Sequence, residues 1–253
     1  MKRGYTMQNH GKSAVLITGA SRGIGRETAL KFAKEGHPLV INCNNSVSEL
    51  KKIKNYIIEN YKVPCLAIAG NIKNSTFVDE MFDTAEKELG EIEILINNAG
   101  ISHIGLLSDM SNEDWDTIIG TNLSSVFYCS RRAIPAMVRK QRGKIINISS
   151  VWGICGASCE AAYSASKGGI NSLTRALGKE LAPSNIQVNA IACGVIDTDM
   201  NKCFSNEERE ALADEIPAGR FGEAKEVAEL VYDLALKHNY MTGQIIQFDG
   251  GWI

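Results

Sequence analysis

Short runs of aliphatic and β-branched residues alternate with longer amphipathic stretches along most of the chain. Apolar runs bounded by turn residues predict buried strands, and the longer periodic stretches predict helices. The expected strands are 14–18, 39–42, 65–69, 92–96, 144–148, 187–191 and 244–248, and the expected helices are 24–34, 46–60, 75–89, 112–140, 161–181 and 225–236. Because such strands need cover on both faces, the pattern predicts one parallel sheet of about seven strands with helices on both faces. This arrangement is a doubly wound α/β fold.

Two regions depart from this regular pattern. The stretch 112–140 is long for one helix, and we expect it to bend near Pro135. The segment 197–217 is polar and has no clear periodicity, so we expect it to be loosely structured.

The first expected strand runs directly into a glycine-rich turn that opens a helix, Thr18-Gly19-Ala20-Ser21-Arg22-Gly23-Ile24-Gly25. Glycine permits a tight turn and a close approach of the backbone to a phosphate. The start of the helix adds free N–H groups and the positive end of a dipole. In this context the turn predicts a Rossmann-type dinucleotide site, whose contacts are Gly19, Ser21, Arg22, Gly23, Ile24 and Gly25. The alternative is a structural turn in an α/β protein that binds another ligand.

The end of the second expected strand indicates which dinucleotide is bound. Proteins that bind NAD usually hold the ribose 2′-hydroxyl with an acidic residue at this place. The segment 36–48 contains no Asp or Glu, and Arg22 lies in the glycine-rich turn. A guanidinium near that ribose pairs well with a 2′-phosphate. We therefore expect NADPH/NADP+ in preference to NADH, whereas the alternative is that Arg22 is simply solvated.

Tyr163 and Lys167 are spaced to lie one above the other on one face of a helix. A free tyrosine has a pKa of about 10, and a close ammonium favours its phenolate, so the pair could exchange a proton near neutral pH. Ser150 follows the fifth expected strand, and its hydroxyl could return over the tyrosine to bind a carbonyl oxygen. The three residues predict acid–base chemistry at a carbonyl group. The alternative is a buried tyrosine capped by surface polar groups.

Taken together and in this order, the motifs resemble those of the short-chain dehydrogenase/reductase family. The resemblance covers the chain from about Ala14 to Trp252 and also rests on Asn97-Asn98-Ala99-Gly100, Asn122 and Asp249-Gly250-Gly251. It implies an NAD(P)-dependent oxidoreductase that interconverts a ketone and a secondary alcohol by hydride transfer.

The resemblance also implies individual roles. Tyr163 would be the proton donor, Lys167 would lower its pKa and bind the nicotinamide ribose, and Ser150 would orient the substrate carbonyl. Asn122 would hold a water that links Lys167 to solvent. The further cofactor contacts that it implies are Asn71, Asn98, Ala99, Gly100, Ile196 and Thr198.

Two positions depart from the family pattern. The usual Pro-Gly after the sixth strand is here Cys193-Gly194, which we expect to change the stiffness of the loop without loss of binding. The usual Asp after the third strand is here Asn71, whose amide can still hydrogen-bond an adenine.

Several strings are similar to those of 3-oxoacyl-[acyl-carrier-protein] reductases, namely NNAGIS, DWDTIIGTNL, GKIINISS and RFGEAKEVAELV. This similarity implies a substrate carried on an acidic acyl carrier protein in fatty acid biosynthesis. A basic region could meet such a carrier, and it comprises Arg131, Arg132, Arg139, Lys140, Arg142 and Lys144. The alternative is a solvated helix face of mixed charge.

The segment between Ser150 and Tyr163 points to a second substrate. It is similar to a branch of these reductases that reduces a 5-aminopentanone group on a lysine of translation elongation factor P. That group carries an ammonium close to its ketone, which Glu160 could pair with and Trp152 could stack on. Alternatively, Trp152 packs the loop and Glu160 helps to cap the helix. A catalytically silent dinucleotide-binding scaffold is a further alternative, against which the intact Ser150, Tyr163 and Lys167 argue.

No linker, repeat or low-complexity segment divides the chain of 253 residues. We expect a flexible N-terminal leader at 1–12 and a single dinucleotide-binding and catalytic domain at 13–253. The leader lacks the apolar core of a signal peptide, and no stretch approaches the roughly 20 apolar residues of a membrane helix. The resemblance implies a homotetramer that packs the segments 161–181 and 244–253.

Composition sets limits on location and partners. The 7 cysteines are odd in number and scattered, which predicts reduced thiols, no metal site and a cytoplasmic protein. The net charge of −2, without a long basic run, gives no reason to expect nucleic acid or a membrane surface as partner.

Overall fold

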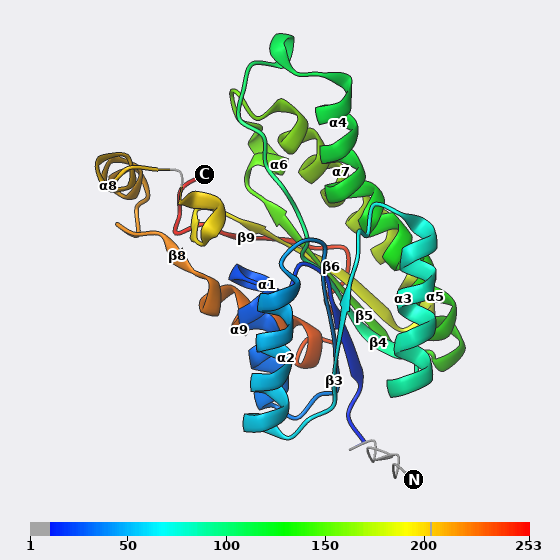
Figure 1. The fold of residues 1–253 in the computed structure, drawn as a ribbon. Coiled ribbons are helices and arrows are strands. Elements are labelled where there is room, and N and C mark those ends of the chain that lie inside the picture. The colour runs from blue at the N-terminus through cyan, green and yellow to red at the C-terminus, as the bar shows by residue number, and fades with distance from the viewer. Residues whose placement is uncertain (1–10, 203) are drawn as a thin grey trace.

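The computed structural model describes residues 11–202 and 204–253, so most of the expected leader lies outside the described residues. In this part of the chain the main sheet has seven strands, all parallel, in the order β3-β2-β1-β4-β5-β6-β9. The strands are β1 (Ala14–Ile17), β2 (Leu39–Cys43), β3 (Cys65–Ala69), β4 (Ile92–Asn97), β5 (Gly143–Ser150), β6 (Ile186–Cys193) and β9 (Ile245–Phe248). From β1 the chain places β2 and then β3 on one side of β1. It then crosses back and places β4, β5, β6 and β9 on the other side of β1 (Figure 1). The expected doubly wound fold is therefore confirmed.

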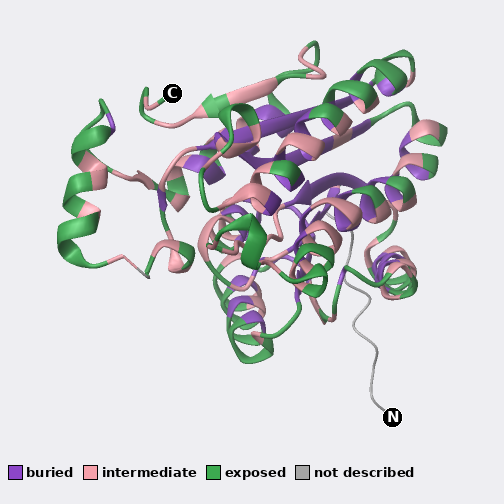
Figure 2. Cartoon of the chain, turned by 90° about the horizontal axis from the view of Figure 1, so that it is seen from above, coloured by how far each residue is buried: buried purple, intermediate pink, exposed green. Residues whose placement is uncertain are grey.

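Helices cover both faces of the sheet (Figure 1). One face carries α1 (Gly23–Lys34), α2 (Val47–Tyr61) and α9 (Ala224–Leu236), and the other carries α3 (Ser75–Leu89), α4 (Asn112–Ile119), α5 (Ser125–Lys140) and α7 (Ala161–Leu181). Figure 2 shows buried strands between helices whose outer faces are exposed. Phe32 and Val231 belong to the buried cluster on the first face, and Phe82 and Met137 to the cluster on the second. None of the described helices combines the length and the apolar character that crossing a membrane requires.

The stretch 112–140 forms two helices instead of one bent helix. A π-helical turn, η2 (Gly120–Ser124), separates α4 from α5, whereas Pro135 lies inside α5 and does not end it. The expected position of the irregularity was therefore wrong. The side chain of Asn122 explains the real position, because it binds the backbone of a neighbouring loop and draws one extra residue into the turn.

The segment 197–217 is more regular than expected. It contains the end of β7 (Ile196–Asp197), the 3₁₀ turn η4 (Asp199–Asn201) and helix α8 (Asn206–Glu215), and β7 pairs with β8 (Gly222–Glu223). A capping box starts α8, in which Ser205 and Glu208 bind each other's backbone N–H. The remaining short elements are η1 (Leu107–Asp109), α6 (Trp152–Cys155) and η3 (Ala182–Ser184). Figure 1 shows α8 set apart from the two helical layers.

Candidate active site

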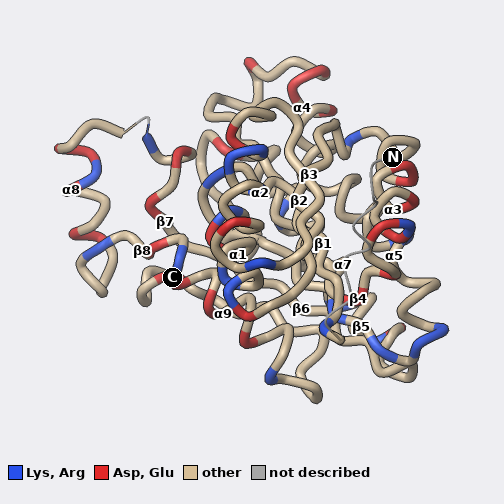
Figure 3. The backbone as a smooth tube through the Cα atoms, turned by 60° about the horizontal axis from the view of Figure 1, so that its bottom comes forward, with Lys and Arg blue, Asp and Glu red and all other residues tan. Residues whose placement is uncertain are grey.

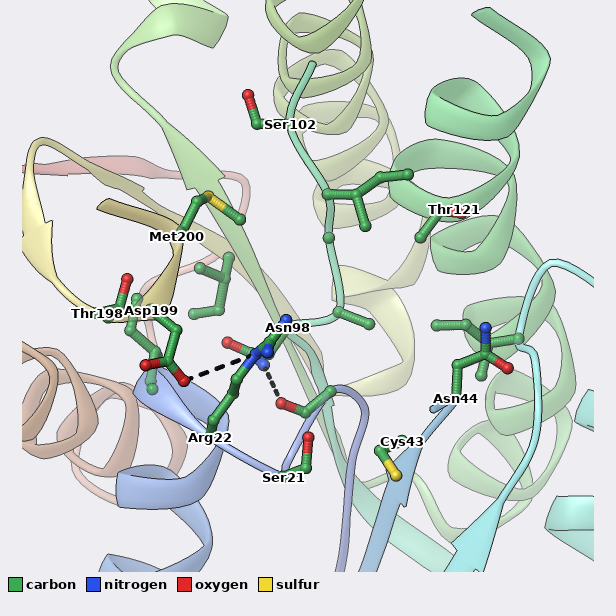
Figure 4. Close-up of a pocket in the computed structure, with 18 of the residues that line it drawn as sticks. Ser21, Arg22, Cys43, Asn44, Asn98, Ser102, Thr121, Thr198, Asp199 and Met200 are labelled. Carbon is green, nitrogen blue, oxygen red and sulfur yellow. Dashed lines mark hydrogen bonds and ion pairs between the residues drawn. The ribbon is translucent and has the colours of Figure 1, made fainter. Parts of the chain in front are cut away.

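A cavity of about 820 Å³ opens at the carboxyl ends of the parallel strands. Its walls come from the segments that follow β1, β2, β4, β5 and β6, on both sides of the point where the strand order reverses. Ligands of open α/β sheets bind at this place, because the diverging loops leave a crevice there. Figure 4 shows part of the cavity, with Ser21 and Arg22 on one wall and Ser102 and Thr121 on another.

The glycine-rich turn forms one end of the cavity. Gly19 and Gly23 have φ angles of 66° and 53°, which favour glycine. A Cβ on Gly19 would lie 2.7 Å from Cα of Ala99, and one on Gly25 would lie 2.4 Å from the carbonyl oxygen of Gly19. Gly19 and Gly23 line the cavity, whereas Gly25 supports the turn from behind. The residues predicted to bind pyrophosphate are thus brought together, apart from Gly25.

Asn98 and Thr18 hold this turn against the end of β4. The Nδ2 of Asn98 donates to the carbonyl oxygens of Thr18 and Gly19, at 2.9 and 3.0 Å. The hydroxyl of Thr18 accepts from the N–H groups of Asn98 and Ala99, at 3.0 and 3.1 Å. Asn98, Ala99 and Gly100 all line the cavity. The side chain of Asn98 therefore shapes the site.

The first turn of α1 suits a diphosphate. It contains no acidic residue, and its N-cap residue Arg22 makes no side-chain capping bond. The N–H groups of this turn therefore have no side-chain partner, and Ser21, Gly23 and Ile24 place them at the cavity wall. These residues fit the pyrophosphate of a dinucleotide.

The end of β2 forms the next part of the wall and carries no carboxylate. The residues lining the cavity there are Asn42, Cys43, Asn44, Asn45 and Ser46. The guanidinium of Arg22 lies on the other side of the turn, with its Nε 3.9 Å from Oδ2 of Asp199 (Figure 4). Because the side chain of Arg22 is 67% exposed, this pair is weak and leaves the guanidinium free to turn toward an anion.

The other expected cofactor contacts also line the cavity. Ile196 and Thr198 do so beyond β6, and a Cβ on Gly23 would touch the methyl group of Thr198 at 3.3 Å. Asn71 lines it beyond β3, where its Oδ1 accepts from the N–H of Lys73 at 2.9 Å. This turn leaves the amide nitrogen of Asn71 available for a purine acceptor.

Ser150, Tyr163 and Lys167 meet at the opposite end of the cavity. Ser150 ends β5, and its hydroxyl forms a hydrogen bond with that of Tyr163 in the first turn of α7. Lys167 lies one turn further along the helix, where its Nζ is 5.5 Å from the centre of the Tyr163 ring. The same Nζ donates to the carbonyl oxygen of Ile148 at 2.8 Å.

Burial dominates the titration of both groups. It raises the pKa of the Tyr163 phenol well above its usual value, and the hydrogen bond from Ser150 opposes this rise. It lowers the pKa of the Lys167 ammonium to about 8, and Cys193 opposes this shift. In this structure the pKa of Tyr163 is thus raised, whereas a lowered pKa was expected, because desolvation outweighs the neighbouring ammonium. Tyr163 is consequently protonated at neutral pH.

Asn122 lies behind the cavity and does not line it. Its Oδ1 accepts from the N–H of Ile101, and its Nδ2 donates to the carbonyl oxygen of Ile101 and to Ser166. A Cβ on Gly100 would lie 3.4 Å from the Nζ of Lys167 and 3.5 Å from Oδ1 of Asn122, so the two side chains flank the same glycine. The water that Asn122 is expected to hold remains a prediction.

Trp152 and Glu160 do not line the cavity. The ring of Trp152 packs against Trp252, with 4.9 Å between the ring centres, as expected for a residue that packs the loop. Glu160 is the N-cap residue of α7 but makes no side-chain capping bond. Its Oε2 instead accepts from the hydroxyl of Ser102 at 2.7 Å, and Ser102 does line the cavity.

Several cavity residues were not singled out from the sequence, and two of them, Ser102 and Asp199, contact predicted site residues. Ser102 follows Asn98 and Gly100 within the string NNAGIS, and Asp199 follows Thr198 directly. Their nearness to predicted contacts was the available signal. What sequence alone could not supply is that Ser102 faces Glu160 and that Asp199 faces Arg22.

Comparisons with known proteins agree with this geometry. The family model for short chain dehydrogenase matches residues 13–209. The 3-oxoacyl-[acyl-carrier-protein] reductase FabG of Staphylococcus aureus is 41% identical over 95% of this chain and 97% of its own. The reductase of the same name from Salmonella typhimurium is 39% identical over 97% of this chain and 98% of its own. Among solved structures, one described as a short-chain alcohol dehydrogenase of Sinorhizobium meliloti superposes with a TM-score of 0.89 at 32% identity, covering 95% of this chain and 96% of that one. The chain therefore belongs to the short-chain dehydrogenase family, as an oxidoreductase that interconverts a carbonyl and an alcohol group with a nicotinamide dinucleotide.

Proposed function

We propose that this protein is an NADPH-dependent reductase that converts a ketone to a secondary alcohol, with Tyr163 as the proton donor. The observation that carries the proposal is the meeting of Ser150, Tyr163 and Lys167 on the wall of the cavity whose other end is the glycine-rich turn. A dinucleotide stretched between the two ends would have its nicotinamide beside Tyr163. The intact residues also disfavour a catalytically silent scaffold.

Side chains of the protein donate the proton that the reduction requires and resupply it. When bound, the reduced nicotinamide would supply a hydride to the carbonyl carbon. Ser150 and Tyr163 direct hydroxyl groups at the carbonyl oxygen, and Tyr163 transfers its proton as negative charge develops there. The ammonium of Lys167 stabilises the phenolate that remains, and Asn122 helps to resupply the proton through solvent. The raised pKa of Tyr163 keeps this donor protonated before the reaction.

The preference for NADPH is part of the proposal and rests on charge. No carboxylate lines the cavity at the end of β2, so nothing there repels a 2′-phosphate. Arg22 is the nearest exposed cation of the glycine-rich turn, and a phosphate would compete with Asp199 for its guanidinium.

We expect Arg22→Ala to raise the KM for NADPH by about tenfold or more and to leave the KM for NADH nearly unchanged. The loss of a charge-assisted hydrogen bond worth about 1.5–3 kcal/mol gives this magnitude. Initial rates with each cofactor would measure it. Arg26→Ala is the matched control, because Arg26 lies one turn along α1 and pairs only weakly with Glu27 at 3.6 Å. Equal losses with both cofactors would show that Arg22 does not bind the 2′-phosphate.

The first candidate substrate is a 3-oxoacyl thioester on an acyl carrier protein. Two similar proteins, 41% and 39% identical to this chain, are named as reductases of such substrates, and their names support this candidate. The basic region expected to meet the carrier is largely neutralised by ion pairs, however, and Figure 3 shows acidic residues on α3, which packs against α5. Arg132 pairs with Asp83 and Glu86, and the cations from Arg139 to Arg142 pair with Glu91 and Glu93. The pairs of Glu91 and Glu93 lie at the amino ends of β4 and β5, at the edge of the sheet opposite the cavity, whereas those of Arg132 join α5 to α3. The alternative of a solvated, mixed-charge face fits these residues, so a carrier would have to dock elsewhere.

The second candidate is the 5-aminopentanone group on a lysine of elongation factor P, and Glu160 favours it. Within the described residues, no Lys, Arg or His forms an ion pair with Glu160, and no capping bond uses its carboxylate. Its charge also raises the pKa of Tyr163, which opposes the loss of the proton that reduction requires. A substrate ammonium beside Glu160 would neutralise this charge. A thioester substrate would leave it in place.

We expect Glu160→Gln to lower kcat/KM for elongation factor P carrying the aminopentanone by roughly 10- to 100-fold, from the loss of a charged hydrogen bond. Turnover of acetoacetyl-CoA should be unchanged or faster. NADPH oxidation with the two ketones side by side would measure both, and Glu88→Gln on the exposed face of α3 is the control. Fast reduction of the thioester alone would assign the protein to fatty-acid-type reduction. Reduction of the modified protein alone, lost in the variant, would assign it to modification of a translation factor.

A further inference from the structure

We propose that Asn171 is a positioning residue for the reduction, because it holds helix α6 in the place from which the backbone of α6 orients the hydroxyl of Ser150. The inference rests on the proposed function, in which Ser150 binds the carbonyl oxygen. Asn171 lies two helical turns beyond Tyr163 and one beyond Lys167, on the same face of α7. It does not line the cavity and touches no reacting atom.

The side chain of Asn171 joins three elements. It is 3% exposed, its Oδ1 accepts from the hydroxyl of Ser149 at 2.7 Å, and its Nδ2 donates to the carbonyl oxygen of Gly153 at 3.0 Å. Ser149 belongs to β5 and directly precedes Ser150, whereas Gly153 belongs to α6. Burying an amide is costly unless both of its ends are bonded, and here both are. The amide thus ties the end of β5 and the start of α6 to the catalytic helix.

Helix α6 fits tightly against α7 at Lys167. A Cβ on Gly153 would lie 2.6 Å from the carbonyl carbon of Lys167 and 2.8 Å from its carbonyl oxygen. The hydroxyl of Ser149 also reaches that carbonyl oxygen, at 3.3 Å. A four-residue helix has little stability of its own, so its position depends on such contacts. Asn171 supplies the polar contact on the side facing α7.

The position of α6 decides what Ser150 can donate to. The N–H of Trp152, the first residue of α6, donates to Oγ of Ser150 at 3.2 Å. A serine hydroxyl has one proton and two lone pairs, so this bond occupies a lone pair and leaves the proton for another acceptor. The acceptors available in the cavity are the hydroxyl of Tyr163 and the carbonyl oxygen of a substrate. Without the Trp152 bond, the hydroxyl of Ser150 would be free to rotate and to donate elsewhere.

A double-mutant cycle tests whether Asn171 acts through Ser150. The variants are Asn171→Leu, which keeps the branched shape of the side chain and removes both bonds, Ser150→Ala, and the double variant. NADPH oxidation would be followed with whichever of the two candidate ketones the wild type reduces faster. We expect Asn171→Leu to lower kcat about tenfold, the size of one hydrogen bond, with the KM for NADPH unchanged. In the Ser150→Ala background the same substitution should cost less than about twofold, because its effect passes through Ser150.

The outcomes separate the inference from the function on which it rests. An equal loss from Asn171→Leu in both backgrounds, with Ser150→Ala itself impaired, would make Asn171 a merely structural residue. Failure of the wild type to reduce either ketone, or a fully active Ser150→Ala, would overturn the proposed function and with it the role of Asn171. If Asn171→Leu does not fold, as judged by circular dichroism, Asn171→Ala removes the same bonds without adding apolar volume and replaces it in the cycle.

Discussion

We expect Tyr163→Phe to lower kcat at least about 100-fold, which is the usual contribution of a general acid. The substitution removes only the hydroxyl, so the ring keeps its place on α7 and beside Lys167. Ser150 would still donate to the carbonyl oxygen, but no group would supply the proton as charge develops there. Cofactor affinity should hardly change, because the glycine-rich turn at the other end of the cavity is untouched.

Steady-state NADPH oxidation and quenching of protein fluorescence by the cofactor would separate these two effects. Tyr240→Phe is the control, because Tyr240 is fully exposed and does not line the cavity. Near-normal turnover of Tyr163→Phe with an intact cofactor affinity would show that another group is the acid. A parallel loss of cofactor affinity would instead show that the hydroxyl serves mainly in binding.

Most of the fold was predictable, because the pattern that determines it is local. The strands of a parallel sheet covered on both faces are continuous apolar runs, so their number and order along the chain follow from the residues themselves. The break at Gly120–Ser124 was not predictable, because it depends on a side chain, Asn122, that bonds to a loop 21 residues away in the sequence. Helix α8 was missed although its capping box, Ser205 and Glu208, was present as a signal.

Most of the residues expected in the candidate site line the cavity, whereas Gly25, Asn122, Trp152 and Glu160 do not. Fixed spacings brought Ser150, Tyr163 and Lys167 together, because a strand end and one helix face are geometrically simple. The titration of these groups was not predictable, since the raised pKa of Tyr163 follows from how deeply the cavity buries it. Burial is a property of the assembled domain and has no signature in the spacing of two residues.

The environment of Glu160 shows the same limit. Cys159, directly before it, has a φ of 61°, a conformation that residues other than glycine seldom adopt. The carbonyl of Cys159 accepts from the N–H of Gly105 at 2.8 Å, and the next side chain meets Ser102. This unusual turn directs Glu160 toward Ser102 on the cavity wall and away from the N–H groups of α7, whose capping was one of the two roles considered for it. No residue pattern in the local sequence predicts this positive φ angle at Cys159.

We expect the charge of Lys167 to lower the free energy of unfolding and to be essential for the reaction. The residue is 3% exposed, and its ammonium has a carbonyl oxygen, not a carboxylate, as its hydrogen-bond partner. Burial moves its pKa from 10.5 to about 8, which corresponds to a penalty on the order of 3 kcal/mol for keeping the charge in the folded state. Lys167→Met has a similar volume and no charge, so it removes the penalty. It also removes the group that stabilises the phenolate, and we expect kcat to fall by at least about 100-fold.

The sign of the pH dependence follows from the lowered pKa. Below pH 8 the lysine is charged in both the folded and the unfolded chain, so the full penalty acts on the wild type. Between pH 8 and 10.5 the unfolded chain binds the proton and the folded chain does not, so the wild type gains stability as the pH rises. The Met variant lacks this gain. Its advantage in the free energy of unfolding should therefore be about 1–3 kcal/mol at neutral pH and should shrink at higher pH.

Urea unfolding of the wild type and of Lys167→Met at neutral and at alkaline pH would measure this difference. Titration of groups that do not interact with Lys167 affects both proteins alike and cancels in the comparison. Lys51→Met on the exposed face of α2 is the control and should show no pH-dependent difference. If Lys167→Met were less stable than the wild type at neutral pH, the ammonium would be a net stabilising group. Lys167 would then be a residue that stabilises the fold. A variant that is more stable but inactive would instead mean that Lys167 destabilises the fold and is required for the reaction.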